Sequence, residues 1–173
     1  MKKTIIRVAI SVIAAIIILI TFAFILFRIA FPPAPSLADM TKKFERNQSN
    51  ILKVVAVFRE IQSKAMGIDL VNDEGYSIVI YDSLPVERYV YDDDELGNAF
   101  KSLSDDGCMQ ITKEENSIYF QWWAIRDASS GIVYAIDGEQ PKMRSYFPSE
   151  AKEEIFLPLG YENWYYHSFQ FIR

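Results

Sequence analysis

The densest group of side chains with the potential for chemistry is the acidic run Asp92–Glu95. Carboxylates this close together suit a hard cation such as calcium, or the acid and base pair of a hydrolase or transferase. A calcium loop of the EF-hand type counted from Asp92 would need oxygen ligands where Leu96 and Leu103 stand. The same acids would also stabilise the first turn of a helix that begins near Leu96. We therefore predict helix capping and no metal site, with a carboxylate-dependent hydrolase or transferase as the alternative.

Cys108 and His167 are the single cysteine and the single histidine of the chain. Together they could act as a nucleophile and its base, whereas one histidine is too few for a two-histidine zinc site. Cys108 opens a predicted strand, and His167 lies in another strand near the C-terminus. We interpret them as a buried thiol and an unrelated strand histidine, and we predict no catalytic residue and no cofactor.

Aromatic residues are unusually frequent, with 25 in the chain and 21 of them after the N-terminal apolar segment. In the predicted strands they alternate, so that Phe120 and Trp122 face one side of the sheet while the intervening aromatics face the other. A sheet with one face on the core normally shows water a polar second face. We therefore predict a partly exposed aromatic face, although helix and loop cover would make the same residues ordinary core. The predicted binding residues are Tyr119, Trp123, Trp164, Tyr165 and His167.

A long amphipathic helix precedes these strands. Ser36 can cap its first turn with Asp39 answering three residues later, as in a capping box. Apolar residues then recur at helical spacing from Leu37 to Ala65, and Gly67 is the expected end of the helix. Asn47–Asn50 is the weak point of this helix, because four polar residues of middling helix propensity follow one another.

After Gly67 the apolar period changes from 3.6 to 2, which predicts short strands joined by turns. A short helix is expected around Leu96–Leu103, and one or two helical turns within Ser149–Phe156. Successive strands joined by short turns pair antiparallel. The predicted class is α+β, with the long helix packed on a mainly antiparallel meander sheet and one short extra helix. The predicted strands are 68–71, 76–83, 86–91, 108–113, 117–126, 131–137 and 161–172, with a turn at 127–130.

Val8–Phe27 is a run of twenty uncharged residues. As a helix it spans about 30 Å, the thickness of the hydrocarbon core of a bilayer. Lys2, Lys3 and Arg7 precede it and only Arg28 follows closely, so the positive-inside rule predicts a cytoplasmic N-terminus and an outer domain. We expect an uncleaved single-pass signal anchor in the plasma membrane. The predicted parts are residues 1–31 (tail and anchor), 32–36 (proline-rich linker) and 37–173 (extracytoplasmic domain).

Charge limits the possible partners of that domain. The first 36 residues hold four basic and no acidic side chains, so the remaining 137 carry 14 basic and 23 acidic ones, a net charge of −9. Such a surface repels phosphate backbones, and we predict no nucleic-acid binding. Ser11 and Ala15 stand four apart in the anchor, a spacing that allows two such helices to pack closely and makes self-association one expectation.

The expected function is a non-enzymatic, membrane-anchored interaction module. Envelope-complex subunit, accessory protein and immunity-type protein are the roles considered, with another envelope protein or a glycan as partner. The Met-Lys-Lys start is the only indication of a bacterial source. A ligand sensor that signals through a partner chain is an alternative, like the carboxylate-dependent enzyme.

Overall fold

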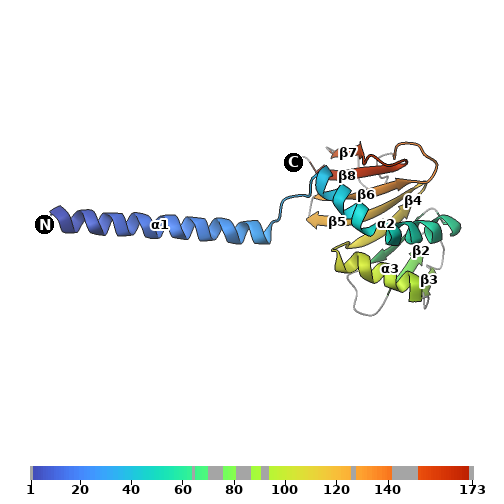
Figure 1. Cartoon of the computed structure of the whole chain (residues 1–173), viewed down its shortest axis with the longest axis horizontal. Coiled ribbons are helices and arrows are strands. Elements are labelled where there is room, and N and C mark those ends of the chain that lie inside the picture. Colours follow the sequence, from blue (N-terminus) through green and yellow to red (C-terminus); the bar gives the residue numbers. More distant parts are fainter. Residues whose placement is uncertain are drawn as a thin grey trace. The chain divides into compact units, whose positions relative to one another are not determined.

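The computed structural model describes residues 2–63, 65–69, 76–80, 87–90, 94–125, 128–141 and 152–171. The chain divides into two compact units, with the boundary between Ala34 and Pro35 (Figure 1). The first unit is the helix α1 (Lys2–Ala30). Its part from Val12 to Ala30 is long and apolar enough to cross a membrane, with a mean hydropathy of 2.9. Inside it the Thr21 hydroxyl donates to the Ile17 carbonyl at 2.9 Å, which satisfies this polar group within the helix.

The second unit begins with helix α2 (Leu37–Glu60), and its N-terminal capping box is confirmed. The Asp39 N–H donates to the Ser36 hydroxyl at 3.2 Å, and the Ser36 N–H donates to the Asp39 carboxylate at 3.0 Å. The predicted end at Gly67 is wrong. The helix ends at Glu60, and Gly67 lies inside a strand, because residues from Ala65 onward form ladder hydrogen bonds instead of helical ones.

The remaining elements of the second unit are eight strands and one further helix among the described residues, and the α+β class is confirmed. All neighbouring strands are antiparallel, in the order β3-β2-β1-β4-β5-β6-β8-β7. The elements are β1 (Ala65–Asp69), β2 (Ser77–Ile80), β3 (Glu87–Val90), α3 (Asp94–Asp105), β4 (Gln110–Glu114), β5 (Ser117–Ile125), β6 (Ala128–Ala135), β7 (Lys152–Pro158) and β8 (Trp164–Phe171).

Two departures from a simple meander shape this sheet. β4 returns to the free side of β1 after α3, and β8 inserts between β6 and β7. The helical turns expected within Ser149–Phe156 are wrong over the described residues, since β7 begins at Lys152 and pairs with β8 along its whole length. The turn expected at Asp127–Ser130 is also wrong from Ala128 onward, where β6 begins.

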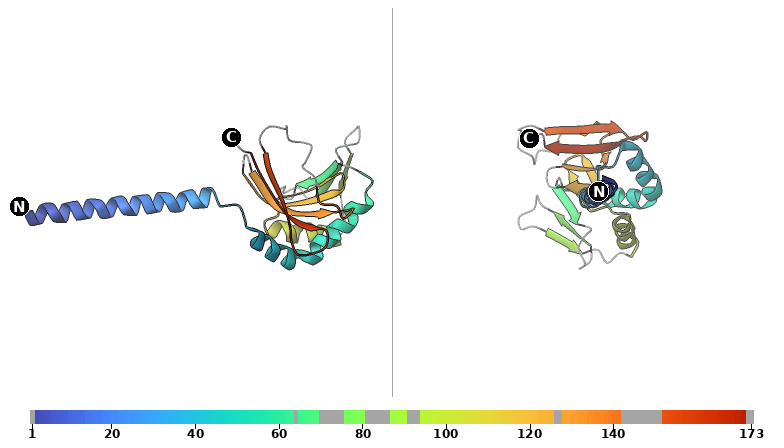
Figure 2. Two further views of the ribbon diagram at one scale, coloured as in Figure 1. Left: turned by 90° about the horizontal axis from the view of Figure 1, so that it is seen from above. Right: turned by 90° about the vertical axis from the view of Figure 1, so that its left-hand side faces the viewer.

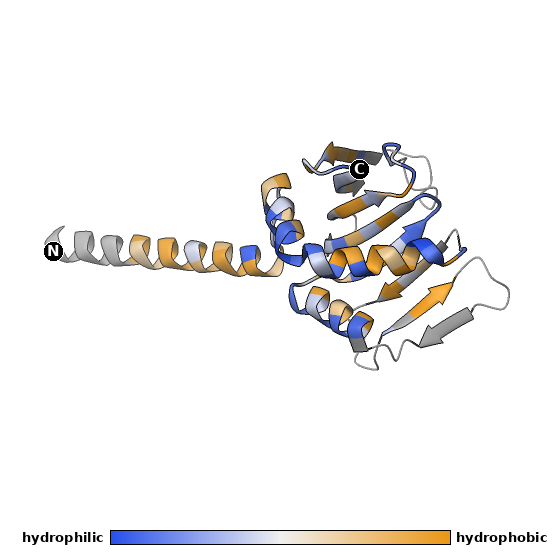
Figure 3. Cartoon of the chain, turned by 45° about the vertical axis from the view of Figure 1, so that its right-hand side comes forward, coloured by the Kyte–Doolittle hydropathy of each residue, from blue (hydrophilic) through white to orange (hydrophobic). Residues whose placement is uncertain are grey.

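Both α2 and α3 lie on one side of the sheet (Figure 2). Polar and apolar residues both recur along α2 (Figure 3), and its buried residues belong to the core that the helix shares with the strands. The helices and the sheet enclose one core, which gives the second unit its shape. Its fully buried side chains include Met40, Phe44, Ile51, Phe58, Phe100, Leu103, Met66, Ile68, Ile78, Ile111, Ile118 and Phe120.

One charged residue is part of this core. Lys113 stands opposite Ile118 on the side of the sheet that the helices cover, and it is only 6 % exposed. Its Nζ donates to the carbonyl oxygens of Phe58 and Ile61, both at 2.8 Å. The ammonium group thus satisfies carbonyls at the C-terminal end of α2 and complements the negative end of the helix dipole.

Candidate functional site on the helix-free face of the sheet

The face of the sheet away from α2 and α3 is called the helix-free face, since no described helix of the second unit covers it. Its side chains are identified by register: Tyr119 pairs with Val133, Val133 with Tyr165, and Phe156 with His167. These residues alternate along their strands with core residues such as Phe120 and Ile132. The described residues of the helix-free face include Tyr119, Val133, Glu154, Phe156, Tyr165, His167 and Phe169, together with the polar Thr112, Gln121 and Ser129.

A buried polar pair lies at the centre of this face. The His167 Nε2 and the Glu154 Oε1 are 2.7 Å apart, and the two side chains are 5 % and 2 % exposed. Glu154 stands two residues from the direct partner of His167, so the two reach each other diagonally across β7 and β8. Since a buried carboxylate is costly unless it is hydrogen-bonded, this contact offsets the cost of burying Glu154.

Aromatic rings enclose the pair. The Tyr119 ring meets the imidazole edge-on at 5.5 Å between centroids, and the Phe156 ring lies at 5.0 Å. Gly131 of β6 is the direct partner of His167 on one side and of Gln121 on the other. A Cβ at Gly131 would collide with the Phe120 carbonyl of β5, so only glycine fits there.

Cys108 and His167 are not brought together. Cys108 belongs to the core on the helix-covered side, whereas His167 lies on the opposite face. The thiol is 2 % exposed, and burial raises its pKa far above the ordinary range. A thiol that stays protonated and buried is a poor nucleophile, and the interpretation of Cys108 as a buried thiol is confirmed.

The acidic run falls partly outside the described residues, which include neither Asp92 nor Asp93. Asp94 opens α3, and Glu95 in the first helical turn pairs with Lys53 of α2 at 2.7 Å. The Glu95 carboxylate thus contacts Lys53, and helix capping by the acidic run stays a prediction. Within the described ranges, no three or more His, Cys, Asp or Glu side chains are grouped so that they could hold a metal ion.

The five predicted binding residues do not form one surface. The expectation of exposure is wrong for three of them, because Tyr119, Trp164 and His167 are 3 %, 5 % and 4 % exposed. Trp164 packs in the helix-covered core with its ring centroid 4.7 Å from that of Phe44. Trp123 and Tyr165 are half-buried. Ligand binding by any of the five stays a prediction.

A β-bulge in β5 places Trp123 on a different face of the sheet from Tyr119, Tyr165 and His167. The register of β5 and β6 shifts between Gln121 and Trp123, which places Trp123 opposite Ser130, two residues from the core residue Ile132. Trp123 therefore belongs to the helix-covered side, and strict alternation along β5 was the wrong assumption. The structure brings Tyr119, Tyr165 and His167 together on the helix-free face and adds Glu154, which sequence reasoning missed. The apolar run Ile155–Leu157 before Pro158 is the strand signal that could have revealed it.

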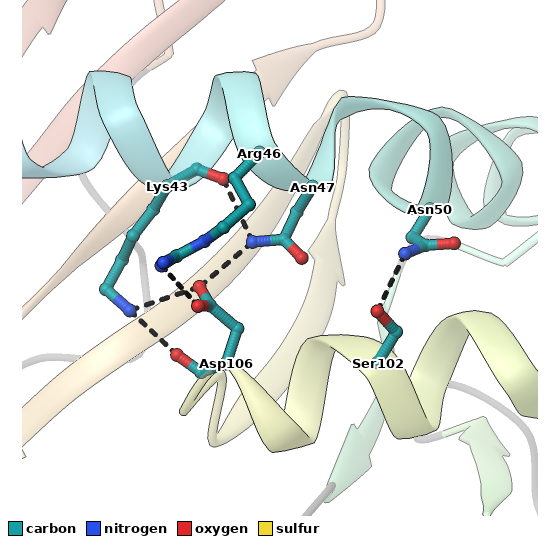
Figure 4. Close-up of polar contacts among 6 residues, drawn as sticks. All are labelled: Lys43, Arg46, Asn47, Asn50, Ser102 and Asp106. Atoms are coloured by element: carbon teal, nitrogen blue, oxygen red, sulfur yellow. Dashed lines mark hydrogen bonds and ion pairs between the residues drawn. The ribbon is translucent and has the colours of Figure 1, made fainter.

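A second polar cluster joins α2 to α3 and is structural (Figure 4). Asp106 accepts hydrogen bonds from Lys43 Nζ, at 2.7 Å on its carbonyl and 3.2 Å on its carboxylate, and from Asn47 Nδ2 at 2.9 Å. Its carboxylate also pairs with Arg46. Asn50 donates to the Ser102 hydroxyl at 2.9 Å. The polar stretch expected to weaken α2 thus attaches it to α3, and α2 is continuous through it.

No family model, curated protein or solved structure matches the chain.

Proposed function

We propose that this protein is a membrane-anchored interaction module whose outer domain binds another component of the cell envelope through the helix-free face. Support for the anchor comes from the apolar helix Val12–Ala30. Support for the orientation comes from the basic residues before the span, which favour a cytoplasmic N-terminus. The proposed location is the plasma membrane of a bacterium, with the second unit outside.

The observation that carries the proposal is the apolar character of the helix-free face. An antiparallel sheet with helices on one side normally shows polar residues on the other. Here that side carries Val133 and Phe169, which are 0 % and 4 % exposed, and Tyr165, which is half-buried and keeps part of its side chain accessible to a partner. Aromatic side chains bury a large area at little cost in conformational entropy, which is why they are enriched in contacts between proteins.

The surroundings of the candidate catalytic groups Cys108, His167 and Glu95 support a binding function over a catalytic one. The thiol and the imidazole lie on opposite faces, and Glu95 is engaged by Lys53. The imidazole is hydrogen-bonded to Glu154 and covered by rings, so a substrate has no access to it in this conformation. Another envelope protein is the proposed partner, and a glycan, which also stacks on aromatic rings, is the other candidate.

The test compares the full-length tagged chain with Tyr165→Ala and with a matched control, Tyr161→Ala. Tyr165 is half-buried on the helix-free face, whereas Tyr161 is 38 % exposed and contacts Phe44 of α2. Each protein is captured from detergent-solubilised envelopes of the source cell, and co-purified proteins are quantified by mass spectrometry. Circular dichroism checks that all three are folded.

We expect one protein to be enriched with the wild type and with Tyr161→Ala, and to fall at least tenfold with Tyr165→Ala. Equal enrichment by all three would place the binding surface elsewhere. No enrichment by any of them would contradict a protein partner, and the same variants would then be tested on immobilised cell-wall polysaccharide.

A further inference from the structure

The strand β7 forms one edge of the sheet, and its described neighbour is β8 alone. Ile155 and Leu157 lie on its helix-covered side, and they are 38 % and 41 % exposed. Exposed apolar residues on the same face of an edge strand favour pairing with another strand. Native sheets normally prevent such pairing with charged residues or with short edge strands.

The direction of the backbone groups along this edge follows from one hydrogen bond. The Leu159 N–H donates to the Trp164 carbonyl of β8 at 2.9 Å, in continuous register with Leu157 and Tyr166. The backbone N–H and carbonyl groups of successive residues point to opposite sides of a strand. The N–H and carbonyl groups of Ile155 and Leu157 therefore point to β8, whereas those of Phe156 and the carbonyl of Pro158 point outward. Pro158 has no N–H, and an outward position on an edge strand is where proline is tolerated.

We propose that β7 pairs antiparallel with β7 of a second copy of this chain, about a two-fold axis at Phe156. The two Phe156 residues then exchange two N–H to carbonyl hydrogen bonds. In the same register Ile155 of each copy stands opposite Leu157 of the other, so that four exposed apolar side chains cover one another. A two-fold axis makes the same patch serve both copies, and no charged pair is opposed among these residues.

Other registers fit less well. An axis at Ile155 would set Leu157 against Glu153, and an axis at Glu154 would bring two glutamates together. Only the axis at Phe156 buries both exposed apolar residues against apolar partners and lets the outward backbone groups of Phe156 bond to each other.

The second copy is the proposed occupant because both chains would share one membrane. A contact between two edge strands is small beside the roughly 1,200–2,000 Å² of stable interfaces, so it gains from confinement. The inference depends on the proposed membrane anchor for that confinement, and it is independent of the partner proposed for the helix-free face.

Disulfide trapping in membranes tests the register. Two differently tagged full-length chains are co-expressed, one with Ile155→Cys and the other with Leu157→Cys. Opposed residues of this kind have Cα atoms about 4.5 Å apart, within disulfide range. Two Ile155 residues would be about 8 Å apart, beyond that range. The native Cys108 is buried and stays out of the reaction.

We expect mild oxidation to give a mixed disulfide dimer from the Ile155→Cys and Leu157→Cys pair, at least fivefold above either variant expressed alone. Leu52→Cys on α2, 46 % exposed, is co-expressed with each as the control for random encounter. A mixed dimer no more abundant than in the Leu52→Cys control overturns the proposal, as does equal cross-linking by Ile155→Cys alone. Since Tyr165 is not altered, either result leaves the test of the helix-free face unaffected.

Discussion

The two faces of the sheet both bury apolar side chains, but they are stabilised in different ways. On the helix-covered face, Phe44 and Phe58 of α2 pack against strand residues such as Ile118 and Phe120, and all four are at most 1 % exposed. On the helix-free face, rings of the strands enclose a hydrogen-bonded histidine and glutamate.

Substitutions on the two faces should therefore change the free energy of unfolding for different reasons. A close-packed apolar core loses stability in proportion to the volume that is removed from it. A buried polar pair contributes little net stability when it is intact, but it is costly when one partner is lost. The helix-covered face therefore contributes most of the stability of the fold, and the helix-free face carries a buried polar pair that is costly to break.

Phe44→Ala should cause the largest loss of stability, because it removes a buried ring from the core on the helix-covered face. Its ring lies 4.7 Å from those of both Tyr161 and Trp164, and the residue is 1 % exposed. We expect a loss of about 3–5 kcal/mol in the free energy of unfolding, measured by urea titration with tryptophan fluorescence. Leu52→Ala, on the exposed side of the same helix, should change it by less than about 0.5 kcal/mol. Similar losses for both variants would contradict the assignment of α2 faces.

Glu154→Ala should show how much the free energy of unfolding depends on the hydrogen-bonded pair of His167 and Glu154. It leaves the buried imidazole without this carboxylate, and we expect a loss of about 1–3 kcal/mol. The double variant Glu154→Leu/His167→Phe removes both polar groups and should recover most of that loss, because apolar replacement of both partners can be nearly neutral. The same urea titration decides the matter, and a double variant as unstable as the single one would argue against this view of the helix-free face.

Asp106→Ala tests what attaches the two helices to each other. Its carboxylate accepts from Lys43 and Asn47 and pairs with Arg46, and its side chain is 16 % exposed. We expect a loss of about 1–2 kcal/mol, the lower part of the range for bonds to charged groups because the Arg46 partner is exposed. Asp105→Ala, a change to the exposed neighbour, is the control and should have little effect on the urea midpoint.

Ser36→Ala should have the smallest effect, about 1 kcal/mol from the lost N-cap. Hydrogen bonds from the Ser36 hydroxyl and backbone N–H lower the pKa of Asp39 below 3.8. A carboxyl with a lowered folded-state pKa stabilises the fold above its unfolded pKa and ceases to do so as the pH falls through the folded value. Wild-type stability should therefore contain a contribution that is present above about pH 3.8 and is lost as the pH falls from there through the lower folded pKa of Asp39, and in Ser36→Ala this part should be smaller. Unfolding measured from pH 2 to pH 6 checks both.

Several features were predictable because neighbouring residues determine them. The apolar helix follows from a twenty-residue run without charge, and the start of α2 from Ser36 and Asp39 three positions apart. The buried stripe of α2 follows from its helical spacing. Each of these features depends on contacts within one or two helical turns, and such contacts can be inferred from the spacing of residues in the sequence.

Features that depend on distant segments were missed. The end of α2 at Glu60 depends on Lys113, 52 residues or more further on, which donates to its last carbonyls. The bulge near Trp123 depends on how β5 registers with β6, and β7 depends on the insertion of β8 beside β6. The candidate site follows the same rule, since Tyr119, Glu154 and His167 come from three strands.

The sequence by itself determined the apolar N-terminal helix, the N-terminal cap of α2 and the α+β class, because hydrophobic periodicity and short-range hydrogen bonds depend on residues that are close together in the chain. Only the tertiary structure decided which aromatic side chains share a face, which charged groups are buried, and which strand is left at the edge. These depend on strand order and register, where a shift of one residue moves every side chain to the opposite face.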